Sequence, residues 1–127
     1  MGFLTANLNS QAAERGDAFA QCSLGYFYDL GEGITKDDIL AYTWFRKSAE
    51  QGFAGAQHSL GLSYARGEGV TKDNVLGYFW FNLSAGQGRT KASDAGNDLS
   101  KQMTPKQIAE AQRMTREWKP TMPADSP

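Results

Sequence analysis

The side chains of this sequence best suited to covalent chemistry are Cys22 and His58, its only cysteine and its only histidine. A thiol hydrogen-bonded to an imidazole can act as a nucleophile, because the imidazole accepts the thiol proton. The two residues lie 36 positions apart, and the sequence offers no evident third residue to orient the imidazole. The pair therefore predicts a nucleophile only if the fold brings both side chains within hydrogen-bond reach.

The same spacing of 36 residues recurs along the chain. Residues 16–51 align without a gap on residues 52–87, with identity at 21 of 36 positions. Chance would match only a few of these positions, so the pattern indicates an internal duplication. Cys22 and His58 occupy the same place in the two copies. Equivalent residues of adjacent helical repeats are about 10 Å apart, which favours a groove-lining role over a catalytic pair.

Each copy predicts two helices joined by a glycine-rich turn. In the first copy, Ala20, Leu24 and Tyr28 recur every four residues and share one face of a helix over residues 18–30. Gly31 is expected to end this helix, and Asp37 to cap the next one. The second helix carries Tyr42, Trp44, Phe45 and Ala49, and the second copy repeats the arrangement with Tyr78, Trp80, Phe81 and Ala85. We interpret these aromatic side chains as core and not as a cofactor site.

The segments outside the two copies predict partial or divergent repeats within a single domain. Residues 12–16 resemble residues 48–52, so residues 1–15 are expected to contain the second helix of a truncated pair. Residues 88–118 keep only traces of the pattern and predict a divergent pair that caps the stack. Thr104, Pro105 and Gln107 form a strong helix-start signal there. Residues 119–127 hold three prolines and predict a disordered tail.

Composition restricts the possible ligands. Of the 127 residues, 13 are basic and 14 acidic, without a basic stripe, which disfavours nucleic acid and anionic membranes as partners. The single cysteine excludes an internal disulfide, and no metal-ligand cluster or phosphate-binding loop is evident, so no cofactor is expected. No apolar run approaches the ~20 residues of a membrane span. The first residues lack the features of a signal peptide, which favours the cytoplasm, or the periplasm or exterior if a leader has been removed.

The repeats resemble a known family, the Sel-one-like repeats, a branch of the tetratricopeptide-like helical repeats. The resemblance rests on the residues Ala18, Ala20, Leu24, Gly25, Tyr28, Gly31, Gly33, Asp37, Ala41, Trp44 and Ala49, and on Ala54, Ala56, Leu60, Gly61, Tyr64, Gly67, Gly69, Asp73, Trp80 and Ala85 in the second copy. The sequence departs from the family pattern at Gly77, where alanine is usual, and lacks the cysteine pairs of some members. The resemblance implies an all-α superhelix of antiparallel helix pairs that acts as an adaptor for other proteins. The final helix pair is similar to the closing element of bacterial members.

By the same resemblance, the first helix of each pair lines the concave groove of the superhelix. In the first copy this selects Phe19, Cys22, Tyr26, Asp29 and Leu30, which fall within about 100° of arc opposite the Ala20 face. The equivalent predicted groove positions are Gly55, His58, Leu62, Ala65 and Arg66 in the second copy, and Lys91, Asp94, Asp98 and Lys101 in the third. The apolar character of the first set suggests a contact surface. It would equally suit a face covered by residues 1–14 or by a second copy of the chain.

Two functions of different classes follow from these observations. The first is a non-enzymatic adaptor that binds a partner peptide or protein in the groove. The alternative is a structural module that self-associates through its repeat ends or its groove, for example as a homodimer. A hydrolase built on Cys22 and His58 is the least favoured hypothesis, because its geometry and its third residue are both lacking.

Overall fold

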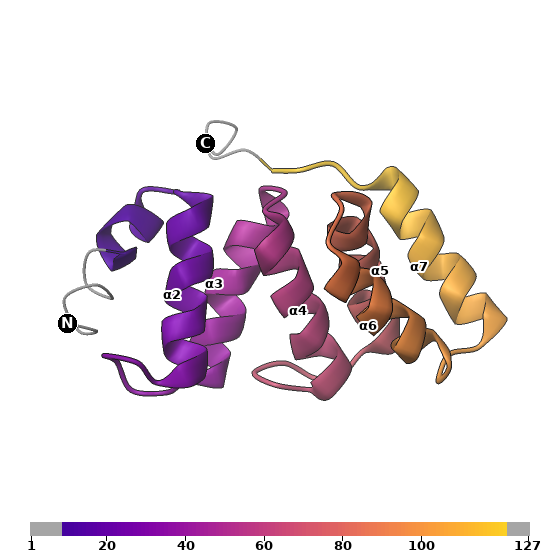
Figure 1. The fold of residues 1–127 in the computed structure, drawn as a ribbon, viewed down its shortest axis with the longest axis horizontal. Helices are drawn as coiled ribbons and strands as arrows, with labels where there is room; N and C mark the ends of the chain where they lie inside the picture. Colours follow the sequence, from indigo (N-terminus) through magenta and orange to yellow (C-terminus); the bar gives the residue numbers. More distant parts are fainter. Residues whose placement is uncertain (1–8, 122–127) are drawn as a thin grey trace.

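The computed structural model describes residues 9–121, and within this range all regular secondary structure is helical, with no strand. Residues 9–14 are helical, and six further helices follow in a row along the molecule (Figure 1). Their bounds are Ala18–Leu30 (α2), Asp38–Glu50 (α3), Ala54–Arg66 (α4), Asn74–Gly86 (α5), Thr90–Ser100 (α6) and Pro105–Glu117 (α7). The predicted all-α architecture of stacked helix pairs is confirmed.

The predicted helix boundaries are set by local hydrogen bonds. The Asp37 carboxylate accepts a bond from the backbone N–H of Leu40, and Asp73 does the same for Leu76. At the other end of the first helices, Gly31 and Gly67 adopt left-handed backbone conformations with φ of 72° and 69°. Glycine is favoured at such positions because it has no Cβ to clash.

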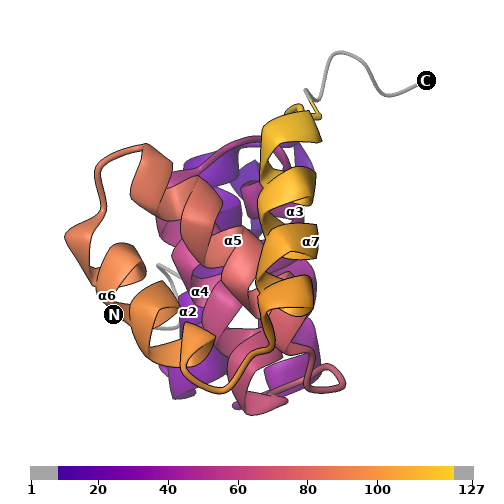
Figure 2. The same cartoon turned by 90° about the vertical axis from the view of Figure 1, so that its right-hand side faces the viewer.

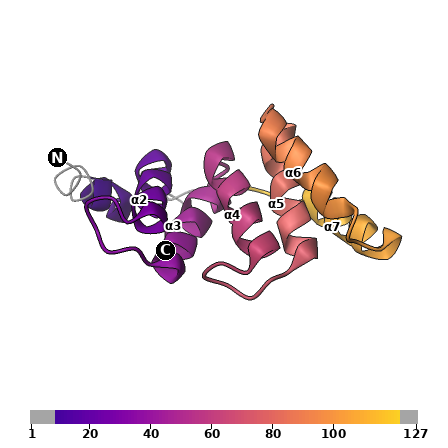
Figure 3. The ribbon, with the colours of Figure 1, turned by 60° about the horizontal axis from the view of Figure 1, so that its bottom comes forward.

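The long turns of the two repeats, at residues 31–37 and 67–73, protrude at the same edge of the stack (Figures 1 and 3). The second turn also packs against the first repeat. A Cβ built on Gly69 would lie 2.1 Å from the carbonyl oxygen of Asp38, at the start of α3. This glycine therefore allows both a positive φ and a close approach between the repeats.

Each helix pair is held by a phenylalanine that packs on a glycine. A Cβ on Gly25 would lie 2.6 Å from the ring of Phe45, and one on Gly61 would lie 2.5 Å from the ring of Phe81. Both rings are buried. The leucine–glycine pair of the repeat thus brings α2 close to α3 and α4 close to α5, as expected from the small residues of the sequence.

Buried glutamines link each pair to its neighbour. Gln57 donates to the carbonyl of Ala49 at 3.3 Å, and Gln21 donates to that of Ala13 at 3.1 Å. Ala13 thus takes the place that Ala49 holds one repeat later, in line with the prediction that the chain opens with the second helix of a truncated pair. Residues 1–8, the remainder of that predicted segment, lie outside the described residues.

The two C-terminal helices, α6 and α7, both pack on α5 and lie on opposite sides of it (Figure 2). Helix α6 buries Ala92, Gly96 and Leu99. A Cβ built on Gly77 of α5 would lie 3.1 Å from the Cδ2 methyl group of Leu99. Helix α7 starts at the predicted Thr104–Gln107 capping box. Both helices pack on α5 because its aromatic side chains leave apolar surface on two sides.

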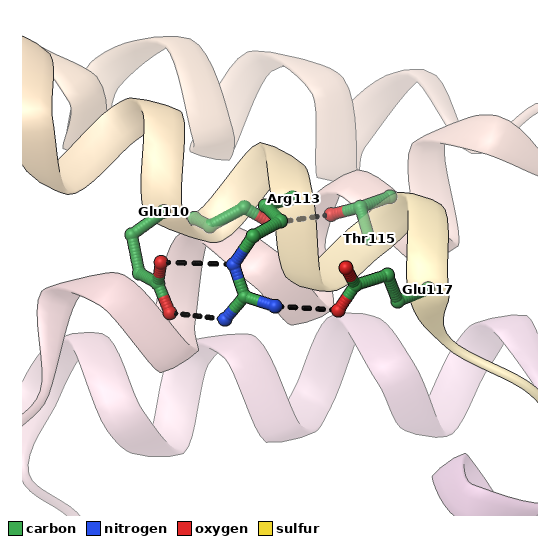
Figure 4. Close-up of polar contacts among 5 residues, drawn as sticks. Glu110, Arg113, Thr115 and Glu117 are labelled. Carbon is green, nitrogen blue, oxygen red and sulfur yellow. Dashed lines mark hydrogen bonds and ion pairs between the residues drawn. The ribbon is translucent and has the colours of Figure 1, made fainter.

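The outer face of α7 is polar. The Arg113 guanidinium bridges Glu110 and Glu117, with its Nη2 atom 2.6 Å from Glu110 Oε1 (Figure 4). All three side chains are exposed, so the bridge contributes little stability in water. It leaves the opposite face of α7, with Ala111, Met114 and Trp118, to pack on the core.

The two tryptophans at equivalent repeat positions, Trp44 and Trp80, differ in burial, which corrects the expectation that both lie buried between their helices. Trp80 is 7% exposed and meets the Trp118 ring at a centroid distance of 6.2 Å. Trp44 is only half-buried, with the Lys47 ammonium 5.2 Å from its ring centroid. The reason is the added helix, since α7 covers α5, whereas α3 packs on α2 and α4.

The chain after α7 turns back across the stack (Figure 1). The backbone N–H of Thr121 donates to the carbonyl of Glu50 at 2.6 Å, at the end of α3. Lys119–Thr121 belong to the segment predicted as a disordered tail, and residues 122–127 of that prediction lie outside the described residues.

Candidate functional site

A pocket of about 250 Å³ opens between the first helices of the two repeats and the start of α6. Helix α2 contributes Tyr26 and Asp29, and α4 contributes His58, Leu62 and Arg66. Helix α6 contributes Lys91, so six of the fourteen positions that the sequence predicted for a groove line this pocket. The structure adds Phe45, Ser59, Ser63, Glu68 and Arg89 to the lining.

The apolar part of the pocket is held in a defined geometry. The Tyr26 ring packs edge-on against Phe45, with centroids 5.1 Å apart. The Ser59 hydroxyl on α4 donates to the Tyr26 hydroxyl oxygen at 2.8 Å. Tyr26 is therefore fixed from both sides while it stays 39% exposed. An aromatic ring that is rigid before binding loses little conformational entropy when a ligand packs on it.

Three permanent cations surround the other part of the pocket. Arg66 ends α4 and lies 3.8 Å from the Glu68 carboxylate. Arg89 is the N-cap residue of α6, and Lys91 lies in the first turn of that helix. Neither Arg89 nor Lys91 forms an ion pair with any residue in the range 9–121.

His58 lies within this cationic surrounding. Burial lowers its pKa, and the positive charges of Arg89, Lys91 and Arg66 lower it further. The imidazole is therefore neutral at physiological pH, where the pKa of a free histidine would already leave most of it uncharged. Its ring lies 5.9 Å from that of Phe81, so it also packs on the core.

Cys22, also predicted for the groove, is buried and does not line the pocket. Burial raises the pKa of its thiol to about 12. At neutral pH the thiolate fraction is thus negligible, and the thiolate is the reactive form. The structure gives no support to the nucleophile that the spacing of Cys22 and His58 could have produced.

The remaining predicted residues lie outside the pocket. Phe19 and Leu30 are 66% and 61% exposed, and Phe19 meets only the edge of the Phe53 ring, at 6.0 Å between centroids. Asp94 and Asp98 lie on the exposed side of α6, where Asp98 is 3.5 Å from Lys101. Of the five predicted residues on α2, only Tyr26 and Asp29 therefore line the pocket.

Arg89 is the main pocket residue that sequence reasoning missed. It occupies the repeat position of Asp17 and Phe53, directly before a first helix. The sequence prediction considered only positions within the helices, so this one was not selected. The sequence did carry a signal for this position, because the residue there changes from Asp17 to Phe53 to Arg89 along the three repeats.

Other kinds of site find no support in the described part of the chain. Between residues 9 and 121, no three potential metal-ligating side chains gather in one place. Over the same range, no helix has the combination of length and apolar character that a membrane crossing requires.

Comparison with known proteins reveals relatives of this fold. The model of the Sel1 repeat family matches residues 18–53 and 54–88. A protective antigen present in uropathogenic Escherichia coli strains, which displays an SLR fold, has 32% sequence identity and a TM-score of 0.85 over 89% of this chain. A Sel1 repeat protein from Oxalobacter formigenes has 41% identity and a TM-score of 0.69, over 71% of this chain and 68% of its own. The chain spans only 24% of the length of the Escherichia coli antigen. No curated protein sequence matches the chain.

Proposed function

Since this chain belongs to the Sel1 repeat family, whose members are generally protein-interaction modules, we propose that it binds a segment of a partner protein in the pocket between α2, α4 and α6. The observation that carries the proposal is the composition of this pocket. It combines a fixed aromatic ring, Tyr26, with an aliphatic neighbour, Leu62, and a rim of charged side chains.

This composition suits a polypeptide better than a small metabolite. Interfaces between proteins draw most of their affinity from a few aromatic and arginine anchors, and Tyr26, Arg66 and Arg89 are of these types. The pocket lies on the face formed by successive first helices, so an extended segment could continue along the face beyond it. With two full repeats the contact is short, and the affinity is expected to be modest unless several copies act together.

The test uses a displayed library of random peptides selected on the purified chain. Peptides selected by the parent should bind the Tyr26→Ala variant at least about tenfold more weakly, the loss typical of an interface anchor. The matched control is Arg116→Ala, an exposed residue of α7 far along the chain from the pocket. Affinities are measured by fluorescence anisotropy, with circular dichroism to show that each variant is folded.

Two results would contradict the proposal. One is a folded Tyr26→Ala variant that binds the selected peptides as well as the parent does. The other is a library from which the parent selects no peptide above background. In the first case the interface would lie on another face, and in the second the chain would not bind short segments.

A competing proposal is self-association, and a specific observation favours it. Phe19, Leu30 and Ile39 are large apolar side chains that remain 61–67% exposed, and exposed apolar surface often marks an interface. Sedimentation equilibrium separates the two proposals. A dimer that persists in Tyr26→Ala and dissociates in a Phe19→Ser/Leu30→Ser variant would support assembly through this surface.

A further inference from the structure

The pocket has two ends with different charge. One end of the pocket is formed by Asp29, in the last turn of α2, and by Arg66, in the last turn of α4. Glu68, the ion-pair partner of Arg66, lies just after α4 at the same end. Arg89 lies at the other, because its Nη1 atom is 3.7 Å from the position of a Cβ on Gly55, in the first turn of α4. Acidic side chains therefore balance the charge of one end only.

The positive end holds two cations that share no counter-ion. Arg89 and Lys91 are two residues apart, both line the pocket, and both lack an ion-pair partner among residues 9–121. Both act on His58 strongly enough to lower its pKa, with Arg89 the stronger of the two. A neutral His58 does not attract an anion through a net charge, but its ring N–H can still donate a hydrogen bond to one. An anionic group from a ligand would relieve the repulsion between Arg89 and Lys91.

The apolar side chains lie between the two ends of the pocket. Tyr26 presents an exposed ring held by Ser59 and Phe45, and Leu62 lies on the same helix as His58, one turn further along. A ligand that places a carboxylate between Arg89 and Lys91 can therefore set an adjacent apolar side chain on Tyr26 and Leu62.

The surroundings disfavour a polyanion such as a nucleic acid. The chain has a formal net charge of −1, and α6 continues from Lys91 into the exposed Asp94 and Asp98. The other end of the pocket presents Asp29 and Glu68. A phosphate backbone needs a continuous basic track, whereas one carboxylate next to an apolar residue needs only the two cations and the ring.

We propose that the pocket selects an acidic peptide segment, in which an Asp or Glu carboxylate binds Arg89 and Lys91 and a neighbouring apolar side chain packs on Tyr26 and Leu62. This inference rests on the proposed function, since it names the chemistry of the segment bound in the same pocket. It also predicts which end of the pocket the carboxylate occupies, because Asp29 would repel a carboxylate placed at the opposite end.

The experiment reads the composition of the peptides that the parent chain selects from the random library. They should be enriched in Asp or Glu next to an aromatic or aliphatic residue. Their affinity for an Arg89→Glu/Lys91→Glu variant should fall at least about tenfold, because two attractive contacts become repulsive. It should also fall as the salt concentration rises, since salt screens charges near the surface.

The variant and its control are matched in charge. Glutamate near the N-terminus of α6 suits the helix dipole, so Arg89→Glu/Lys91→Glu should fold. The control, Lys106→Glu/Arg116→Glu, makes the same change in net charge at two exposed positions of α7 and should keep the parent affinity. Replacing the acidic residue of a peptide with Gln should weaken its binding to the parent but not to the pocket variant, which isolates the pairwise contact.

The outcomes separate the two proposals. Peptides that need Tyr26 but show no acidic enrichment would overturn this inference and leave the proposed function standing. Acidic peptides that bind both charge-reversed variants equally would also overturn it. Peptides that bind regardless of Tyr26 would overturn the proposed function itself. A single-stranded oligonucleotide that displaces the peptides with equal affinity would assign the cations to nucleic acid and overturn the inference.

Discussion

Helices α3 and α5 hold the same place in two copies of one repeat, yet they have different surroundings. Helix α5 packs on α4, α6 and α7, whereas α3 packs on α2 and α4. Val75 and Leu76 at the start of α5 are partly buried against the core. Their counterparts Ile39 and Leu40 are exposed, with Ile39 at 67%.

At one position, the sequences of α3 and α5 reflect their different surroundings. Phe79 of α5 is buried against Trp80, with ring centroids 4.8 Å apart. The equivalent residue of α3 is Thr43, whose hydroxyl donates to the carbonyl of Ile39. A repeat therefore does not determine burial by itself. The burial of a residue depends on which helices pack around it, and Phe79 lies in the same buried cluster as Ala111 of α7.

The largest test of this comparison is to remove α7. Deleting residues 104–121 should expose Phe79, Trp80 and the apolar face of α5, because a terminal element caps the open end of a repeat stack. The loss should match most of the stability of a domain of this size, about 5 kcal/mol or more. Thermal unfolding followed by circular dichroism, with sedimentation velocity for aggregation, measures it.

Arg113→Ala serves as the control for this deletion, because it changes only the exposed face of α7 and should unfold at nearly the parent temperature. A truncated chain that stays monomeric and unfolds cooperatively would show that α5 does not depend on α7.

The second test compares the two tryptophans. Trp80→Ala should lower the free energy of unfolding by about 3–5 kcal/mol, as for a buried aromatic residue. Trp44→Ala should cost about half as much, because the Trp44 ring is half-buried and loses less apolar contact. Urea unfolding of both variants gives the difference, and equal losses would mean that α7 does not set the burial of Trp80.

The third test concerns a feature in which the repeats agree. Gly25→Ala and Gly61→Ala should each lower the free energy of unfolding by about 1–3 kcal/mol, because the new methyl group overlaps the ring of Phe45 or Phe81. Alanine favours the helix by about 1 kcal/mol, which offsets only part of this cost. Urea unfolding should give losses of similar size. A clear difference between them would show that the helix pairs are not packed alike.

The smallest effect is expected at Gly77. A Cβ there would lie 3.1 Å from the Leu99 Cδ2 atom and 3.3 Å from the Gly61 carbonyl oxygen. The flexible end of Leu99 can move, so the strain should nearly cancel the helix preference of alanine, and Gly77→Ala should change the free energy of unfolding by less than about 1 kcal/mol. In the first repeat, Ala41→Gly should instead lose about 1–2 kcal/mol. Differential scanning calorimetry of the pair checks this, and a large loss in Gly77→Ala would mean that Leu99 cannot shift.

Part of the candidate site could be predicted from the sequence. Tyr26, Asp29, His58, Leu62 and Arg66 were selected from a single helical arc, because residues at helical spacing share a face whatever packs against it. Their role in binding stays a prediction. Arg89 could not be selected in this way, because it lies outside the helices and reaches the pocket only through the position of α6 relative to α4. Cys22 was selected but is buried, in the cluster that also contains Phe45 and Leu60.

The repeat, the helices and their ends follow from local sequence. These features depend on contacts within a few residues, such as the caps at Asp37 and Thr104, and on a duplication visible at 21 aligned positions. Which of two equivalent residues is buried, and which charges meet at the pocket, became clear from the packing of the helices. The physical reason is that a helical pattern specifies which face turns inward, whereas burial and electrostatic potential depend on every element that packs against that face. Those elements differ at α3 and α5, because α6 and α7 follow only the second repeat.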